Sequence, residues 1–210
     1  MHSSLLDWLK QRLTNGEDPT TLLTEVAAAL ATSAPQTSEV LGTRLDLGRA
    51  ERCGHPEVVY AAGKSVNELL AIVGRLRAAE QDVLVTRATP EQGEAVTGKH
   101  PDTHWNPVAR TLRYSAPGRP MSGRVIVVTA GTSDRPVAEE ALETLAFLGV
   151  ETELITDIGV AGPWRLLEQL PRLRTADALV VVAGMEGALP SVVGGWVPCP
   201  VIAVPTSVGY

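Results

Sequence analysis

Apolar and polar positions alternate most regularly in the second half of the chain. Short runs rich in Val, Ile, Leu and Ala predict strands at 125–129, 151–155, 178–183 and 200–204. Between these runs, apolar residues at helical spacing predict a helix over 137–148 and shorter helices from Pro163 and near Pro190. The run at 178–183 is almost entirely apolar, as expected of a central strand covered on both faces. Strands and helices that alternate in this way predict a parallel, doubly wound sheet.

The first half of the chain shows weaker periodicity. Two short helices are expected before residue 31 and form a helical hairpin. A strand at 57–60, a helix that opens with the capping box Ser65 and Glu68, and a strand at 82–86 read as a βαβ unit. Residues 98–115 indicate a return strand or hairpin. His100 and His104 lie four positions apart, a spacing that brings two metal ligands together only on a helix. Because Pro101 argues against a helix there, we expect no metal site.

Composition separates these halves and limits the function classes. The segment SAPGRPMSG is the clearest linker in the chain. We therefore expect four parts: N-terminal helices over 1–35, a small α/β domain over 36–115, a linker at 116–123 and a sheet domain over 124–210. The net charge of −6 gives no electrostatic drive toward nucleic acid. Two distant cysteines form no disulfide framework, and no apolar stretch has the length of a signal peptide or a membrane span. We therefore expect a cytoplasmic protein without a membrane partner.

Candidate chemistry gathers in three loops that follow strands of the predicted parallel sheet. Such loops lie at one edge, where this architecture binds ligands. The first loop precedes a helix, so its N–H groups make an anion site, although a plain capping turn explains the same residues. The candidate binding residues in the three loops are Thr132, Ser133, Asp134, Pro136, Gly184, Met185, Gly187, Ala188, Thr206 and Ser207.

Three cations of the first half are further candidates. Arg49 stands among alternating charges, which indicate either a solvated turn or an arginine-lined site for a carboxylate or phosphate. Lys64 and Arg87 follow predicted strands, where open α/β sheets bind ligands, or are ordinary surface cations.

The loops and their flanks resemble a known family. The segments GTSDRPVAEE, DIGVAGPWRLL, VVVAGMEGALPSVVGG and PVIAVPTSVGY, together with DLGRAERCGHPEVVYAAGKS and VLVTRATPEQ, are similar to LarB, whose C-terminal domain is related to the enzyme that moves a carboxylate on aminoimidazole ribonucleotide. The resemblance implies a flavodoxin-like, three-layer, mutase-like C-terminal domain after a smaller α/β domain.

The resemblance also implies a reaction. CO2 carboxylates C5 of the pyridinium ring of nicotinic acid adenine dinucleotide, and hydrolysis of the phosphoanhydride releases AMP, as the first step toward the nickel-pincer cofactor of lactate racemase. A cysteine thiolate adds to the ring and makes C5 nucleophilic, and a carboxylate later removes the C5 proton. Glu186 matches that carboxylate, and we expect partial burial of its side chain. The alternative is a loop carboxylate that bonds its own backbone.

Two departures from the family pattern affect this hypothesis. The nucleophilic cysteine of the family follows PTSVGYG, and neither Cys53 nor Cys199 matches it, so we expect either a truncated chain or a degenerate homologue. Trp164 stands where relatives commonly have His.

Alternative functions and several properties stay open. Two alternative hypotheses are an aminoimidazole ribonucleotide carboxylate mutase and a non-catalytic nucleotide-binding homologue. The resemblance implies an octamer and no tightly bound cofactor, with CO2 as co-substrate. Mg2+ assistance of the phosphoanhydride step stays open, because one Asp with substrate phosphates suffices to hold Mg2+.

Overall fold

The structure, a computed structural model, describes residues 2–32, 36–118 and 120–207. Of residues 2–6 and 27–32 it describes only the helical backbone. The chain forms two compact units, residues 1–57 and residues 58–210, and each is described by itself. Among the described residues, no helix is both long enough and apolar enough to cross a bilayer.

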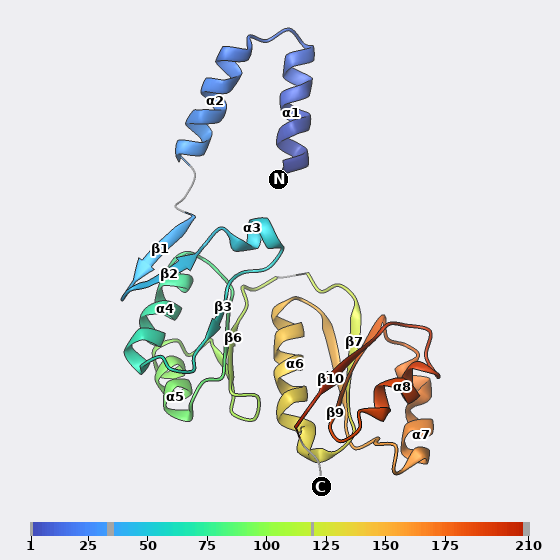
Figure 1. Cartoon of the computed structure of the whole chain (residues 1–210). Helices are drawn as coiled ribbons and strands as arrows, with labels where there is room; N and C mark the ends of the chain where they lie inside the picture. Colours follow the sequence, from blue (N-terminus) through green and yellow to red (C-terminus); the bar gives the residue numbers. More distant parts are fainter. Residues whose placement is uncertain (1, 33–35, 119, 208–210) are drawn as a thin grey trace. The chain divides into compact units, whose positions relative to one another are not determined.

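The first unit contains the two expected helices, α1 (His2–Thr14) and α2 (Pro19–Thr32), followed by elements that the apolar pattern did not predict (Figure 1). Strands β1 (Thr37–Val40) and β2 (Thr43–Asp46) pair as an antiparallel hairpin, and α3 (Arg49–Cys53) follows. Leu41 and Gly42 turn between the strands with positive φ. The hairpin was missed because its strands are short and its turn lacks the usual Asn-Gly signal.

The second unit begins with a small mixed sheet in the order β3-β4-β6-β5. Its strands are β3 (Val58–Tyr60), β4 (Val83–Thr86), β5 (His104–Asn106) and β6 (Thr111–Tyr114). The parallel pair β3 and β4 is connected through α4 (Val66–Ala78), whose capping box is present, so the predicted βαβ unit is confirmed. The two remaining strands are antiparallel, which confirms the return hairpin.

One helix of this small domain was not predicted. Helix α5 (Pro90–Lys99) begins with a capping box formed by Thr89 and Gln92. Its apolar signal is weak because glycines interrupt it. Gly93 is needed where it stands, since a Cβ at this position would lie 2.5 Å from the Trp105 ring.

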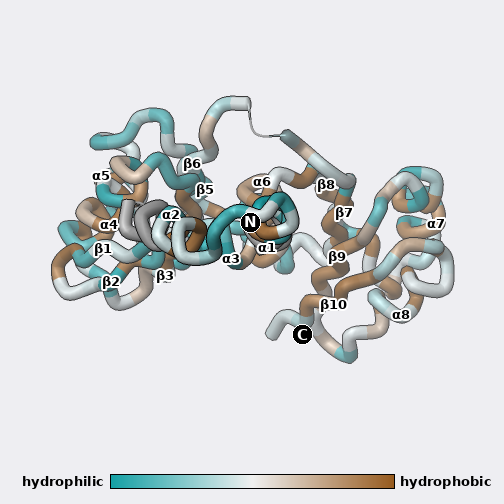
Figure 2. The backbone as a smooth tube through the Cα atoms, turned by 90° about the horizontal axis from the view of Figure 1, so that it is seen from above, coloured by the Kyte–Doolittle hydropathy of each residue, from teal (hydrophilic) through white to brown (hydrophobic). Residues whose placement is uncertain are grey.

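The second sheet is fully parallel, as predicted, in the order β10-β9-β7-β8. Its strands are β7 (Arg124–Thr129), β8 (Glu151–Ile155), β9 (Ala178–Ala183) and β10 (Val201–Pro205). Helix α6 (Arg135–Phe147) covers one face, while α7 (Pro163–Leu173) and α8 (Ala188–Gly194) cover the other (Figure 1). The two central strands, β7 and β9, are strongly hydrophobic (Figure 2), as burial on both faces requires.

Helix α6 also contacts strands β4 and β6 of the small sheet. It therefore lies between the two sheets and needs a second buried face. That face is polar: Glu143 is only 7% exposed and accepts hydrogen bonds from Arg113 and Asn106. An ion-paired carboxylate thus replaces the apolar residue that ordinarily occupies such a position.

Candidate functional site

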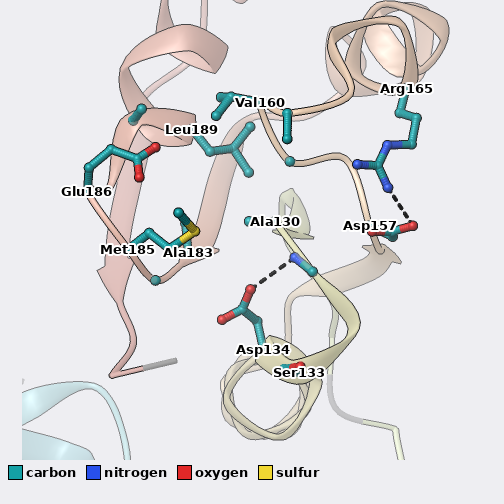
Figure 3. Close-up of a pocket in the computed structure, with 15 residues that line it drawn as sticks. Ala130, Ser133, Asp134, Asp157, Val160, Arg165, Ala183, Met185, Glu186 and Leu189 are labelled. Carbon is teal, nitrogen blue, oxygen red and sulfur yellow. Dashed lines mark hydrogen bonds and ion pairs between the residues drawn. The ribbon is translucent and has the colours of Figure 1, made fainter. Parts of the chain in front are cut away.

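A pocket of about 410 Å³ opens at the edge of the parallel sheet where β7, β8 and β9 end (Figure 3). This is the edge at which doubly wound sheets bind ligands. The pocket is lined by Ala130, Gly131, Ser133, Asp134, Asp157, Gly159, Val160, Ala161, Arg165, Ala183, Gly184, Met185, Glu186, Ala188 and Leu189. The predicted first and second loops therefore meet in one site.

The first loop is closed by Asp134, which is the last residue of the short 3-10 helix Thr132–Asp134 and is 4% exposed. One carboxylate oxygen accepts a hydrogen bond from the Gly131 amide at 3.0 Å. The other accepts from the Thr206 hydroxyl at 2.7 Å. Asp134 thus has protein partners on both oxygens, and it joins the loop after β7 to the loop after β10.

Of the remaining candidates in the first and third loops, some line the pocket and others do not. Ser133 lines the pocket, whereas Thr132 and Pro136 are exposed and are not among the lining residues. Thr206 donates a hydrogen bond to Asp134 and does not line the pocket, and Ser207 is exposed. The end of the third loop, residues 208–210, lies outside the described residues.

The second loop presents a free carboxylate. Met185 and Gly187 have positive φ on either side of Glu186, and this turn displays the Glu186 side chain before α8 begins. Glu186 is exposed, so the expected partial burial of its side chain was wrong. Glu186 lies in the middle of an exposed turn, because its neighbours Met185 and Gly187 are exposed as well. Among the described residues, its carboxylate has no hydrogen-bond or ion-pair partner, which also contradicts the alternative of bonding to its own backbone.

A fourth loop, after β8, completes the pocket and was missed as a site. Its carboxylate Asp157 forms an ion pair with Arg165 at 2.6 Å, and Asp157 has positive φ. Gly159 donates to the Ala130 carbonyl at 2.9 Å, and a Cβ on it would lie 2.8 Å from that oxygen. Only glycine permits this close approach. The signal was available, because this loop also follows a strand of the parallel sheet.

The three cations predicted from the first half do not line the pocket. Arg49 begins α3 in the first unit. Lys64 and Arg87 follow β3 and β4, as expected, but these strands belong to the small mixed sheet rather than to the parallel sheet. The apolar pattern predicted both strands correctly, but it did not show that the ligand pocket would lie at the edge of the other sheet.

Charge in the pocket is mostly negative. Within the described part of the chain, Arg165 is the only cationic side chain that lines it, beside the carboxylates of Asp134, Asp157 and Glu186. Glu186 and Arg165 lie on opposite sides (Figure 3). The described residues contain no group of three side chains suited to hold a metal ion. The arrangement offers a free base on one side and a guanidinium for an anion on the other.

Neither cysteine belongs to this site. Cys53 is exposed in the first unit, and Cys199 is partly buried and packs against the core of the parallel sheet. Trp164 is exposed at the start of α7 and does not line the pocket.

Comparison with known proteins identifies both domains. Residues 37–116 match the family described as LarB/PurE-like N-terminal domain, and residues 124–210 match AIR carboxylase. An uncharacterized protein of Methanocaldococcus jannaschii is 41% identical over 178 residues, which cover 80% of this chain and 69% of the relative. The chain belongs to the LarB family. This confirms the resemblance and the α/β fold with its parallel C-terminal sheet.

A second relative matches a shorter stretch of this LarB-family chain. The N5-carboxyaminoimidazole ribonucleotide mutase of the same organism is 33% identical over 81 residues, which cover 39% of this chain and 51% of the mutase. The two domain matches support a carboxylase-type enzyme of the carboxylase/mutase group.

Proposed function

We propose that this protein carboxylates C5 of the pyridinium ring of nicotinic acid adenine dinucleotide with CO2 and hydrolyses the phosphoanhydride, releasing AMP. The product would serve synthesis of a nickel-pincer cofactor. One observation carries the proposal: a LarB-type N-terminal domain and an AIR carboxylase domain occur together on one chain. The mutase relative matches only 39% of the chain, so the additional domain argues for a different substrate.

The chemistry requires a nucleophile and a base. A thiolate adds beside the ring nitrogen and gives a dihydropyridine, whose C5 attacks CO2 and forms the new carbon–carbon bond. A base then removes the C5 proton, the electron pair restores the aromatic ring, and the thiolate leaves. We propose Glu186 as this base, because its side chain lines the pocket and its carboxylate has no partner among the described residues. We assign neither Cys53 nor Cys199 the thiolate role, since both lie outside the pocket.

Binding would use the other pocket groups. The substrate carries a ring carboxylate and phosphates, and the Arg165 guanidinium suits either anion. Its ion pair with Asp157 holds the guanidinium at the pocket. The Ser133 hydroxyl stands at the start of α6, where the positive end of the helix favours an anion. We propose no tightly bound cofactor for these steps, and leave Mg2+ addition as a variable of the assay.

The experiment is a product assay with the full-length gene product. The enzyme is incubated with nicotinic acid adenine dinucleotide and 13C-bicarbonate, with and without Mg2+, and the products are separated by mass spectrometry. We expect AMP together with a pyridinium mononucleotide that carries one additional labelled carboxylate. A folded protein that binds the dinucleotide but gives neither product contradicts the proposal.

A mutase acting on aminoimidazole ribonucleotide is the second candidate, and the match of residues 124–210 to AIR carboxylase favours it. Complementation of a purine auxotroph lacking that enzyme distinguishes the two. Growth would support the mutase, whereas absence of growth with expressed, folded protein would reject it.

We also propose a cytoplasmic homo-oligomer, with an octamer as the first expectation. Large apolar side chains are exposed on and around the edge strand β10, namely Val192, Trp196 and Ile202. Burial of such side chains between subunits would remove them from water. Analytical ultracentrifugation measures the assembly directly, and a monomer at all concentrations would reject it.

A further inference from the structure

Two loops of the small mixed sheet bring arginines together at the beginning of α6. Arg87 follows β4 and Arg110 precedes β6, and both adopt positive φ, at 58° and 57°. The Ala88 amide donates to the Arg110 carbonyl at 2.9 Å, which fixes the two loops side by side. Left-handed backbone at a non-glycine residue is strained, and such residues concentrate at functional sites.

The charge of Arg110 is held but not neutralised. Its Nε donates to the Ala88 carbonyl at 3.0 Å, and a second guanidinium nitrogen donates to the Arg87 carbonyl at 3.3 Å. Within the described chain, no carboxylate pairs with this guanidinium. Two neutral carbonyl oxygens orient it and leave its positive charge available to an anion.

Helix α6 adds a third arginine and connects these loops to the pocket. Arg87 forms a long ion pair of 3.4 Å with Glu140 in the second turn of α6, and 53% of its side chain stays exposed. Arg135, in the first turn, pairs with Glu139 through one nitrogen and is 58% exposed. It directly follows the pocket residue Asp134.

The distance from the pocket suits a ligand longer than one nucleotide. Glu140 stands six positions after Asp134, which corresponds to about 9 Å along the helix axis. Arg87 therefore reaches α6 just beyond the pocket wall. Among the described residues, the pocket itself offers one guanidinium, that of Arg165, beside three carboxylates, so further cations for a ligand with several phosphates have to lie outside it.

We propose that Arg87, Arg110 and Arg135 form an anion surface that binds the phosphate groups of a dinucleotide whose ring occupies the pocket. This inference rests on the proposed function and deepens it: the small domain distinguishes a dinucleotide from a mononucleotide. Guanidinium groups suit this task because their paired N–H groups match phosphate oxygens.

The test compares three ligands by isothermal titration calorimetry: nicotinic acid adenine dinucleotide, nicotinic acid mononucleotide and inorganic pyrophosphate. The variants are Arg87→Gln and Arg135→Gln, alone and together, with Arg87→Lys to retain the charge. Arg110 is kept, because its substitution would also release the loop. Arg172→Gln is the matched control, since this surface arginine also forms an ion pair with a glutamate, Glu153.

We expect the double variant to bind the dinucleotide and pyrophosphate at least tenfold more weakly, while its affinity for the mononucleotide changes less than twofold. Arg87→Lys should retain part of the affinity, and Arg172→Gln should match the wild type. Unchanged dinucleotide binding in the folded double variant, or equal losses for both nucleotides, would overturn the inference.

Failure of the proposed function has a different signature. If the wild type binds neither pyridine nucleotide but binds pyrophosphate in a manner that requires Arg87 and Arg135, the anion surface stands and the proposed substrate is wrong. If the wild type binds none of the three ligands, both are rejected.

Discussion

Replacement of Glu143 by Gln tests whether a buried carboxylate holds α6 against the small sheet. Its side chain accepts hydrogen bonds from Arg113 Nε at 2.8 Å and from Asn106 Nδ2 at 3.1 Å, and His104 Nε2 lies 3.2 Å away. Glutamine has nearly the same shape, so the substitution removes charge with little change of volume. It leaves the Arg113 guanidinium without its carboxylate.

The expected cost follows from this geometry. Breaking a fully buried ion pair costs about 3–5 kcal/mol, and a hydrogen bond to a charged group contributes about 1.5–3 kcal/mol. Because Arg113 is partly exposed and retains water, we expect the lower range, about 2–3 kcal/mol at pH 7. With an m-value of about 2 kcal/mol/M, the urea midpoint should fall by about 1 M.

The pH dependence gives a second signature. Burial disfavours the charged form of Glu143, but the hydrogen bonds from Arg113 and Asn106 and the nearby positive charges outweigh it, so its pKa is lowered in the folded state. A lowered carboxyl pKa stabilises the fold above the unfolded pKa of about 4.3 and loses that effect as pH falls through the folded pKa. The difference between wild type and Glu143→Gln should therefore shrink as the pH is lowered below about 4.3.

Urea unfolding followed by far-UV circular dichroism at pH 7 and at acidic pH measures both effects. Glu151→Gln is the control, because the exposed Glu151 pairs with Arg124 at the surface and should change stability by less than about 1 kcal/mol. A Glu143→Gln variant within about 0.5 kcal/mol of wild type at pH 7, or a difference that grows in acid, would refute the reasoning.

Three further predictions concern the pocket. Gly159→Ala should destabilise the protein by about 1–3 kcal/mol and weaken ligand binding, because the added Cβ would meet the Ala130 carbonyl. Thermal melts measure the stability and calorimetry the binding, and an unchanged variant would show that the loop relaxes freely. Thr206→Val should cost about 1–2 kcal/mol in urea unfolding through the lost bond to the buried Asp134, and a neutral effect would contradict that bond. Glu186→Gln should keep dinucleotide affinity within about threefold and lower the carboxylation rate at least about a hundredfold, which is the usual contribution of a general base. Retained carboxylation would show that Glu186 is not the base.

Sequence patterns determined the elements whose signals are local. The apolar run at 178–183 required burial on both faces, and it is the central strand β9. Ser65 and Glu68 predicted a helix start, because a capping box satisfies backbone donors within four residues. The positions of the loops after β7 and β9 followed from the parallel sheet, since the carboxyl ends of its strands share one edge.

Tertiary structure decided what depends on residues far apart in the chain. Thr206 meets Asp134, which precedes it by 72 positions, and no periodicity reports that contact. The second buried face of α6 arises because the helix packs between two sheets, so a polar Glu143 could be buried against Arg113 from the other sheet. Apolar spacing shows that a face is buried but not against which partner. Arg87 and Glu186 were candidates from the sequence, but the contact of Arg87 with α6 and the unpaired state of the Glu186 carboxylate among the described residues became visible only in the folded chain.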